Sequence, residues 1–448
     1  MSTKTFPLTK EQLEKLAKQY PTPFYLYDEK AIRENAKALL KAFSVFPYYK
    51  EHFAVKALPN PYILKILADE GLGADCSSLP ELLLADMAGM KKEDIILTSN
   101  EAPVREYVKA RELGAIINLD DFTHIAFLEK ALEKSKALPK ALRGLPNLVS
   151  FRYNPGPLKK GNAIIGKPEE AKYGYTREQL FEGYKLLKAK GMKRFGLHTM
   201  VASNELSLDY HLETGKLLFE LAIKIKSKCG VDLEFINLGG GLGIPYKPEQ
   251  KAVSWERLAK GLKKLYDEII VKGGLGGMAI HTEYGRPITG PYGWLVARAI
   301  HKKEIYRNYI GLDACMADLM RPALYGAYHH ITIPGKEDAP VEKTYDVVGS
   351  LCENNDKFAI QRKLPEIEVA ADCLVSANGR LGDFVVIHDT GAHGRAMGFN
   401  YNGKLRCGEL LLRPDGSIKR IRRTETIDDY FTTLDLDGLK EFRTEGVD

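Results

Sequence analysis

The sequence predicts an α/β protein in which a (β/α)8 TIM barrel is followed by a mostly antiparallel β domain. Eight short apolar segments alternate with helical patterns between residues 52 and 283, and this alternation is typical of a (β/α)8 barrel. After residue 286, strand-like segments follow one another across Gly, Pro, Asn and Asp turns, as in antiparallel sheets. The main alternative, a doubly wound sheet, usually stops at about six strands.

Within the barrel, strands and helices are expected in turn along the chain. The expected strands are 52–57, 73–78, 95–100, 115–119, 148–154, 194–201, 234–239 and 278–283. The helical patterns between them include 80–88, 102–113, 122–134, 177–190, 208–228 and 254–271. Before the barrel we expect a helix at 8–19, a strand at 23–28 and a helix at 29–43.

The β domain is expected to contain strand-like segments after residue 290. These are 293–305, 308–312, 345–348, 384–389, 408–412 and 417–422. We therefore divide the chain into an N-terminal segment, 1–35, that partly joins the β domain, a cofactor-binding barrel, 36–290, and a C-terminal β domain, 291–448. The sequence between barrel and β domain has no low-complexity linker, so a firm interface between the two domains is expected.

Composition excludes several classes of protein. The 448 residues are 44% hydrophobic and 28% charged, as in ordinary globular proteins. A net charge of +6 comes from lysines spread along the chain, which predicts no nucleic-acid-binding patch. No apolar run approaches the roughly 18 residues that span a bilayer, and the first residues lack the apolar core of a signal peptide. We expect a cytoplasmic protein that binds neither nucleic acid nor membrane.

The six cysteines are scattered without any Cys-x-x-Cys pair. This spacing predicts neither a disulfide framework nor a zinc site, and no other metal site is expected. The cysteines are interpreted as reduced thiols, and they are Cys76, Cys229, Cys315, Cys352, Cys373 and Cys407.

Lys56 lies near the end of an apolar segment, just before the break Pro59-Asn60-Pro61. Burial lowers the pKa of a lysine, and a partly neutral amine can form a Schiff base with a carbonyl. A single lysine at a strand end more commonly reaches into solvent. The other residues at the carboxyl ends of the barrel strands favour the catalytic interpretation, because these ends meet at one mouth. They are Asp75–Ser78, Asn100, Arg152–Asn154, His198–Ser203, Gly239–Gly241 and Glu283–Arg286.

Gly239-Gly240-Gly241-Leu242-Gly243 directly follows a predicted strand. Glycines allow the backbone to approach a phosphate with its N–H groups, although a glycine run can equally be a tight turn. The run matches neither a P-loop nor the dinucleotide motif. A cofactor with a single phosphate fits it better.

Further candidate groups lie at the last barrel strand and in the β domain. A carboxylate such as Glu283 can keep a pyridine nitrogen protonated, which makes the ring a stronger electron sink, although an ion pair at the barrel rim is an equally good interpretation. Arg321 offers a guanidinium suited to a carboxylate. Cys352-Glu353 and Gly391-Ala392-His393, with Tyr401 after it, are more often ordinary polar loops when such patterns occur alone.

Together and in this order, these motifs resemble the alanine-racemase-like group of pyridoxal-phosphate decarboxylases, and within it the diaminopimelate decarboxylases. The resemblance runs from about Pro23 to beyond Tyr430. Its specific pieces are Phe53-Ala54-Val55-Lys56-Ala57, the run from Gly239 to Tyr246, the run from Arg321 to His329, and Cys352-Glu353 with Asp356.

The resemblance implies a role for each matching residue toward pyridoxal 5′-phosphate (PLP) and substrate. Lys56 would bind the cofactor covalently and move protons. The residues that it places around the cofactor are Lys56, Asp75, His198, Ser203, Gly239, Gly240, Gly241, Glu283, Gly285, Arg286, His393 and Tyr401. Those expected to bind substrate are Arg286, Arg321, Tyr325, Glu353 and His393. Cys352 would be the proton donor, and Cys352 and Glu353 would come from the partner subunit of a homodimer with shared active sites.

Four positions depart from the family's pattern. Met200-Val201-Ala202-Ser203 stands where the family usually has His-x-Gly-Ser, which leaves open whether His198 or Met200 faces the cofactor ring. Tyr284 replaces the proline of Glu-Pro-Gly-Arg, Asn354 replaces a serine after Cys-Glu, and His393 replaces the tyrosine of Gly-Ala-Tyr.

The predicted function is therefore PLP-dependent decarboxylation of a small amino acid. The leading hypothesis is a diaminopimelate decarboxylase, which converts meso-2,6-diaminopimelate to L-lysine and CO2 in lysine biosynthesis. The near rival is a D-lysine/D-ornithine decarboxylase, since related enzymes share a similar Ala-Ser-Asn and Gly-Ala-His pattern. A racemase fits the β domain less well. A non-catalytic relative that binds a partner is the alternative from another class, and the presence of Lys56 argues against it.

Overall fold

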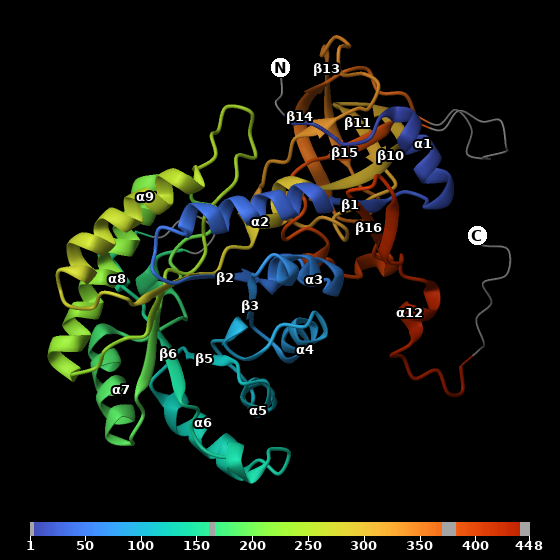
Figure 1. The fold of residues 1–448 in the computed structure, drawn as a ribbon. Coiled ribbons are helices and arrows are strands. Elements are labelled where there is room, and N and C mark those ends of the chain that lie inside the picture. The colour runs from blue at the N-terminus through green and yellow to red at the C-terminus, as the bar shows by residue number, and fades with distance from the viewer. Residues whose placement is uncertain (1–3, 161–165, 370–381, 440–448) are drawn as a thin grey trace.

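The computed structural model describes residues 4–160, 166–369 and 382–439. Eight parallel strands close into a barrel in the order β2 to β9 (Figure 1), which confirms the predicted fold class. The strands are Tyr49–Ala54 (β2), Gly73–Cys76 (β3), Ile95–Thr98 (β4), Ile116–Leu119 (β5), Leu148–Arg152 (β6), Arg194–His198 (β7), Phe235–Asn237 (β8) and Ala279–Thr282 (β9).

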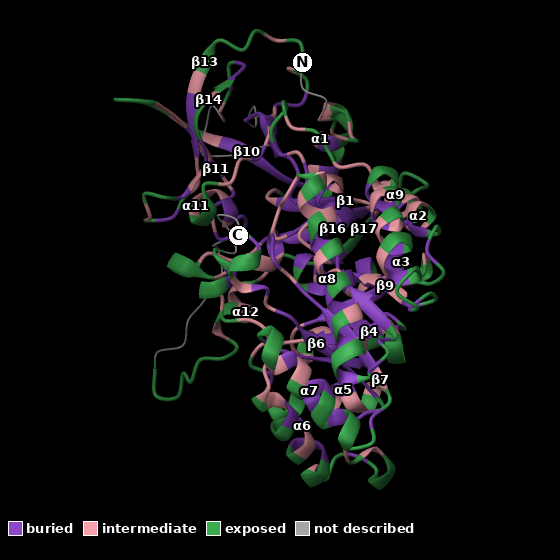
Figure 2. Cartoon of the chain, turned by 90° about the vertical axis from the view of Figure 1, so that its left-hand side faces the viewer, coloured by how far each residue is buried: buried purple, intermediate pink, exposed green. Residues whose placement is uncertain are grey.

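Helices surround the barrel and bury one face each against it. They are Glu29–Phe43 (α2), Pro61–Asp69 (α3), Leu79–Met87 (α4), Val104–Leu113 (α5), Thr123–Lys134 (α6), Arg177–Ala189 (α7), Leu208–Cys229 (α8) and Trp255–Leu265 (α9), the last continued by a π-helical turn, Tyr266–Val271. Side chains such as Ser207 and Ser254 cap helix starts by accepting a backbone N–H. Figure 2 shows the buried residues gathered along the strands and the exposed ones on outer helix faces.

The sequence prediction omitted α3, which begins directly after Asn60. Pro61 occupies the first helical position, where its missing N–H costs nothing, and the Asn60 side chain accepts the N–H of Tyr62. The Pro-Asn-Pro break is therefore the start of a helix as well as the end of the Lys56 segment.

The β domain is a nine-stranded sheet with the order β14-β13-β11-β10-β1-β16-β17, to which β15 is added beside β10 and β12 beside β15. Its strands are Phe24–Asp28 (β1), Gly293–Glu304 (β10), Asn308–Leu312 (β11), Ile331–Thr332 (β12), Lys343–Val348 (β13), Lys357–Leu364 (β14), Phe384–Ile387 (β15), Gly408–Leu412 (β16) and Ile418–Arg422 (β17). Its helices are Lys10–Gln19 (α1), Arg286–Thr289 (α10), Arg321–Tyr325 (α11) and Ile427–Phe431 (α12).

The early strand β1 lies in the middle of this sheet. It pairs antiparallel with β10 and parallel with β16, and α1 packs Leu13 and Leu16 into the same hydrophobic cluster as Phe24 and Leu26. Strand β14 was not predicted from the sequence. Its buried and exposed residues do not alternate regularly, so its sequence lacks the period-2 pattern that identifies a strand.

The buried carboxylate of Glu409 joins the β domain to the Lys56 segment. It accepts hydrogen bonds from the Tyr27 hydroxyl at 2.8 Å and from the Asn60 amide at 3.0 Å, and it also pairs with Arg422. Glu409 lies on β16 and Asn60 immediately precedes α3. The position of the Lys56 segment is thus fixed partly by the β domain.

Across the described residues, no helix combines the length and the apolar character that crossing a bilayer requires. Five of the six cysteines lie among these residues and are free thiols; Cys352 is exposed, whereas Cys76, Cys229, Cys315 and Cys407 are buried. Cys373 lies outside the described residues.

Candidate active site

Lys56 lies on a tight turn at the mouth of the barrel. Strand β2 ends at Ala54, and Val55–Ala57 form a single 3₁₀ turn, so the prediction of a strand to residue 57 was wrong at its end. The neighbours Val55 and Ala57 are fully buried, but the Lys56 side chain is 53% exposed. The Lys56 side chain is therefore not buried, and it reaches out from the turn as a lysine at a strand end commonly does. The turn anchors its backbone and leaves its amine accessible to an incoming carbonyl.

The Lys56 ammonium faces two buried carboxyl groups. Its Nζ lies 3.7 Å from Oδ2 of Asp75. Burial and the nearby charge of Glu283 raise the pKa of Asp75, and Lys56 opposes this shift. Burial alone would raise the pKa of Glu283 as well, yet the facing His198 and, more weakly, Lys56 hold it well below its usual range. Glu283 is thus the ionised member of the pair.

His198 faces Glu283 from the end of β7. Its Nε2 lies 3.0 Å from Glu283 Oε2, and its Nδ1 lies 2.9 Å from the amide nitrogen of Asn118. The His198 ring therefore lies between the Asn118 amide and the Glu283 carboxylate. His198 therefore contacts the acidic group, whereas Met200 lies beside the glycine loop, where its sulfur accepts the Gly240 N–H at 3.4 Å.

Asn237 links Glu283 to the glycine loop and was missed in the sequence analysis. Its amide nitrogen donates to Glu283 Oε1 at 2.7 Å, and its carbonyl oxygen accepts the Gly239 N–H at 2.9 Å. The backbone N–H of Glu283 donates in turn to the Gly239 carbonyl at 2.9 Å. A polar residue inside the apolar strand β8 was the available signal.

The glycines of the loop are required by close packing as well as by conformation. Gly239 and Gly241 have φ angles of +69° and +90°, which favour glycine. A Cβ at Gly239, Gly240 or Gly241 would lie 2.1, 2.3 or 2.6 Å from the carbonyl oxygen of Thr199, Glu283 or Ala202, respectively. The loop is therefore pressed against the barrel backbone and lies next to Glu283.

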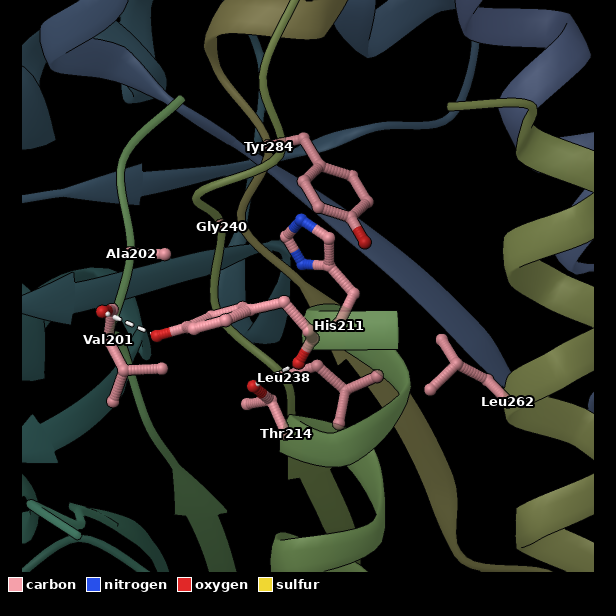
Figure 3. A pocket seen from close by; sticks show the side chains of 9 residues that line it. Val201, Ala202, His211, Thr214, Leu238, Gly240, Leu262 and Tyr284 are labelled. Atoms are coloured by element: carbon pink, nitrogen blue, oxygen red, sulfur yellow. Dashed lines mark hydrogen bonds between the residues drawn. The ribbon is translucent and has the colours of Figure 1, made fainter. Parts of the chain in front are cut away.

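A small pocket lies between this loop and the helices α8 and α9. Figure 3 shows His211 and Tyr284 beside Gly240, with Leu262 of α9 across from them. Tyr210 closes one side, and its hydroxyl donates to the Val201 carbonyl at 3.0 Å. The residues that line this pocket do not include Lys56, Asp75 or Glu283. The pocket therefore lies behind the glycine loop and is separate from the Lys56 site.

Two buried guanidinium groups flank the ring of Tyr246. Arg286 donates to the Tyr246 hydroxyl at 2.6 Å and to Ser203 at 3.4 Å. Arg321 lies 4.7 Å from the centre of the same ring and donates to Nε2 of His329 at 2.8 Å. Among the described residues, no carboxylate lies within 4.0 Å of either guanidinium. Burial, with Arg286 as a secondary cause, lowers the pKa of Arg321.

His393 joins the β domain to the Lys56 turn through its backbone, which donates to the Ala57 carbonyl at 2.8 Å. It has a φ of +54°. Burial and the positive charges of Arg286, Lys56 and Arg321 hold the pKa of His393 well below its usual range. His393 is therefore neutral at physiological pH, in contrast to the titration near neutrality that its side chain alone would suggest.

The structure gives the remaining predicted residues no contact with Lys56 or Glu283. Tyr325 and Tyr401 are each 47% exposed, and Cys352 is exposed on the β domain, where its backbone N–H donates to the Asn402 side chain at 2.7 Å. The Glu353 side chain accepts the N–H of Asn355 within the same turn.

The site as a whole fits PLP. Lys56 provides the amine, and the ionised, buried Glu283 provides a partner for a protonated ring nitrogen. Asp75 Oδ1 is buried without a hydrogen-bond partner among the described residues. Arg286 and Ser203, next to the glycine loop, offer donors for a phosphate.

A family model described as "Pyridoxal-dependent decarboxylase, pyridoxal binding domain" matches residues 29–290. The chain belongs to this family. It is a PLP-dependent decarboxylase, and the matched residues contain Lys56, the glycine loop and Glu283.

Proteins similar over nearly the whole chain support this assignment. Protein TabA of Pseudomonas amygdali pv. tabaci is 40% identical over 95% of this chain and 93% of that protein. The diaminopimelate decarboxylase of Methanothermobacter thermautotrophicus is 34% identical over 92% of each chain. The crystal structure of diaminopimelate decarboxylase from Helicobacter pylori complexed with L-lysine superposes with a TM-score of 0.79 at 26% identity, covering 94% of this chain and 98% of that one.

Replacing Lys56 by alanine tests its covalent role toward PLP. The wild-type protein should show a visible absorption band that borohydride bleaches, because borohydride reduces the Schiff base to a stable secondary amine. Lys56→Ala should lack this band, and Lys65→Ala, on the exposed side of α3, should keep it. A Lys56→Ala protein whose band persists and bleaches normally would show that another amine holds the cofactor.

Proposed function

We propose that this decarboxylase acts on the D-configured carbon of meso-2,6-diaminopimelate and releases L-lysine and CO2. The observation that carries the proposal is the pair of buried guanidinium groups, Arg286 and Arg321, without a carboxylate partner among the described residues. This activity belongs to lysine biosynthesis, and we place it in the cytoplasm.

Two buried like charges on either side of Tyr246 require anionic ligands, because an unpaired buried charge is costly. The cofactor phosphate supplies one anion next to Ser203 and Arg286. The second guanidinium, that of Arg321, requires an anion that is still present after decarboxylation. Diaminopimelate keeps one carboxylate, which becomes the α-carboxylate of lysine. D-Lysine loses its only carboxylate, and its product would bring two ammonium groups toward Arg321.

Two of the similar proteins support this choice. The Methanothermobacter thermautotrophicus relative is named a diaminopimelate decarboxylase, and the Helicobacter pylori enzyme of that name was crystallised with L-lysine. L-Lysine is the product that the proposed reaction releases. A site built to retain the carboxylate of lysine explains why Arg321 is buried and fixed by His329.

The residues of the site divide the chemistry between them. When bound, PLP would supply an electron sink for the pair left on Cα after CO2 departs. Glu283, kept ionised by His198, would hold the proton on the ring nitrogen. Lys56 would bind the cofactor covalently and give up that place to the substrate amine. Cys352 is our candidate for the acid that returns a proton to Cα.

Cys352 acts, in this proposal, in the site of a second subunit. Its thiol is exposed and, among the described residues, makes no contact with Lys56 of its own chain. The side chains of Tyr325 and Tyr401 are also partly exposed. A homodimer that places this surface over the neighbouring barrel mouth would bring acid and lysine together. Glu353, next to Cys352, would then reach the distal amine of the substrate.

The substrate is tested by CO2 release from the PLP-loaded protein with meso-diaminopimelate, D-lysine, D-ornithine and L-lysine side by side. We expect turnover of diaminopimelate with kcat/KM at least roughly 100-fold above that for D-lysine, because a lost charged hydrogen-bond pair at Arg321 costs about 3 kcal/mol. A preference for D-lysine or D-ornithine would replace the proposed substrate by that D-amino acid.

Arg321→Leu tests the residue that selects the second carboxylate. We expect kcat/KM for diaminopimelate to fall by roughly 50-fold or more, mainly through KM, since the arginine binds a part of the substrate that does not react. The PLP dissociation constant should stay unchanged. Arg362→Leu, which removes a part-buried arginine that donates to the His329 carbonyl, is the matched control. An unchanged KM in Arg321→Leu contradicts the assignment.

The shared site is tested by mixing two inactive variants, Lys56→Ala and Cys352→Ala, under conditions that exchange subunits. If Cys352 serves the partner's Lys56, half of the dimers are mixed and each has one intact site, so about a quarter of wild-type activity should return. Each variant alone should stay inactive, and sedimentation should show a dimer. No recovery despite demonstrated exchange would place both residues in one chain's own site.

A further inference from the structure

We propose that Glu51 is a positioning residue for the PLP site. Its carboxyl group accepts the backbone N–H of Tyr284 and thereby fixes the Glu283–Arg286 segment against the turn that carries Lys56. The inference concerns the cofactor site, so it holds for either substrate.

Glu51 lies on β2, beside Thr282 of β9 in the strand register, and is fully buried. Its Oε1 accepts the Tyr284 N–H at 2.6 Å. Its Oε2 accepts the Thr282 hydroxyl, and the Tyr49 hydroxyl lies 3.4 Å away. A buried carboxyl group with these donors is an anchor, since its burial would otherwise cost several kcal/mol.

Two further contacts join the same pair of segments. The Ala54 N–H donates to the Tyr284 carbonyl at 3.3 Å. Gly285 packs so closely on the Lys56 turn that a Cβ there would lie 2.8 Å from the Cβ of Ala57 and 3.1 Å from that of Ala54. Tyr284 is thus bound to β2 through both its N–H and its carbonyl, and the residues on either side of it are Glu283 and Gly285.

The need for Glu51 follows from Tyr284. In the motif that this segment resembles, the position is proline, which has no N–H. With tyrosine the position gains a donor in a buried place, and a buried donor without an acceptor is costly. Glu51 supplies the acceptor.

The charge state of Glu51 agrees with an anchoring role. Burial raises the pKa of Glu51 to about 8, although hydrogen bonds from Thr282 and Tyr284 oppose the shift. The raised pKa favours the neutral form, in which one carboxyl oxygen carries a proton, and so limits the negative charge beside Glu283. A glutamine, which keeps the acceptor oxygen and carries no charge, should replace it.

The test compares Glu51→Leu, Glu51→Gln and two double variants by visible titration with PLP. Glu51→Leu should weaken PLP binding by roughly tenfold, which corresponds to about 1.4 kcal/mol, and Glu51→Gln should stay within about twofold of wild type. Adding Tyr284→Pro to Glu51→Leu should restore affinity, because the unpaired N–H is gone. Adding Tyr284→Ala removes the same ring but keeps the N–H, so it should restore nothing.

The double variants separate positioning from general stability. Loss of the Tyr284 ring, which packs 5.4 Å from Trp255, should lower the thermal midpoint of both double variants alike, whereas only the proline variant should recover PLP affinity. If Glu51→Leu is insoluble, a soluble, PLP-binding Glu51→Leu/Tyr284→Pro protein supports the pairing equally. Wild-type affinity in Glu51→Leu, or equal affinity in the two double variants, overturns the proposal.

Discussion

The active-site mouth depends on keeping the buried carboxylate of Glu283 ionised inside a protein interior that disfavours charge. Asn237 donates to one of its oxygens and His198 lies against the other. Asn118 in turn orients His198. The pKa of the neighbouring Asp75 is raised, because burial and the ionised carboxylate of Glu283 both disfavour a second negative charge there. Strands β5, β7, β8 and β9 thus meet at a single charge.

The same interaction couples the two parts of the cofactor site that a pyridine ring and a phosphate would occupy. Asn237 contacts Glu283 through its nitrogen and Gly239 through its oxygen, and the glycine loop packs directly on the Glu283 carbonyl. Neither part can move without the other. Preorganisation of this kind lowers the cost of binding, since little of the site remains to be ordered when the cofactor arrives.

Periodicity in the sequence was enough to predict the barrel, the antiparallel sheet and the chemistry at the strand ends. It failed where the chain turns without a periodic signal: Lys56 lies on a turn, α3 starts inside Pro-Asn-Pro, and β14 lacks alternation. It also missed Asn118, Asn237 and Glu51. Each is a polar residue within a barrel strand, and its partner comes from another strand, or from the segment after it, that only the closed barrel brings near.

The central place of β1 in the C-terminal sheet has a consequence for how the chain is assembled. Its partners β10 and β16 begin at residues 293 and 408, so the whole barrel is inserted between neighbours of one sheet. On the ribosome β1 emerges first and waits unpaired until the barrel has been synthesised. A fragment that begins at residue 291 would expose the edges of β10 and β16 where β1 belongs, and such edges invite aggregation. The β domain therefore cannot be separated from the N-terminal strand β1 without exposing edges of its sheet.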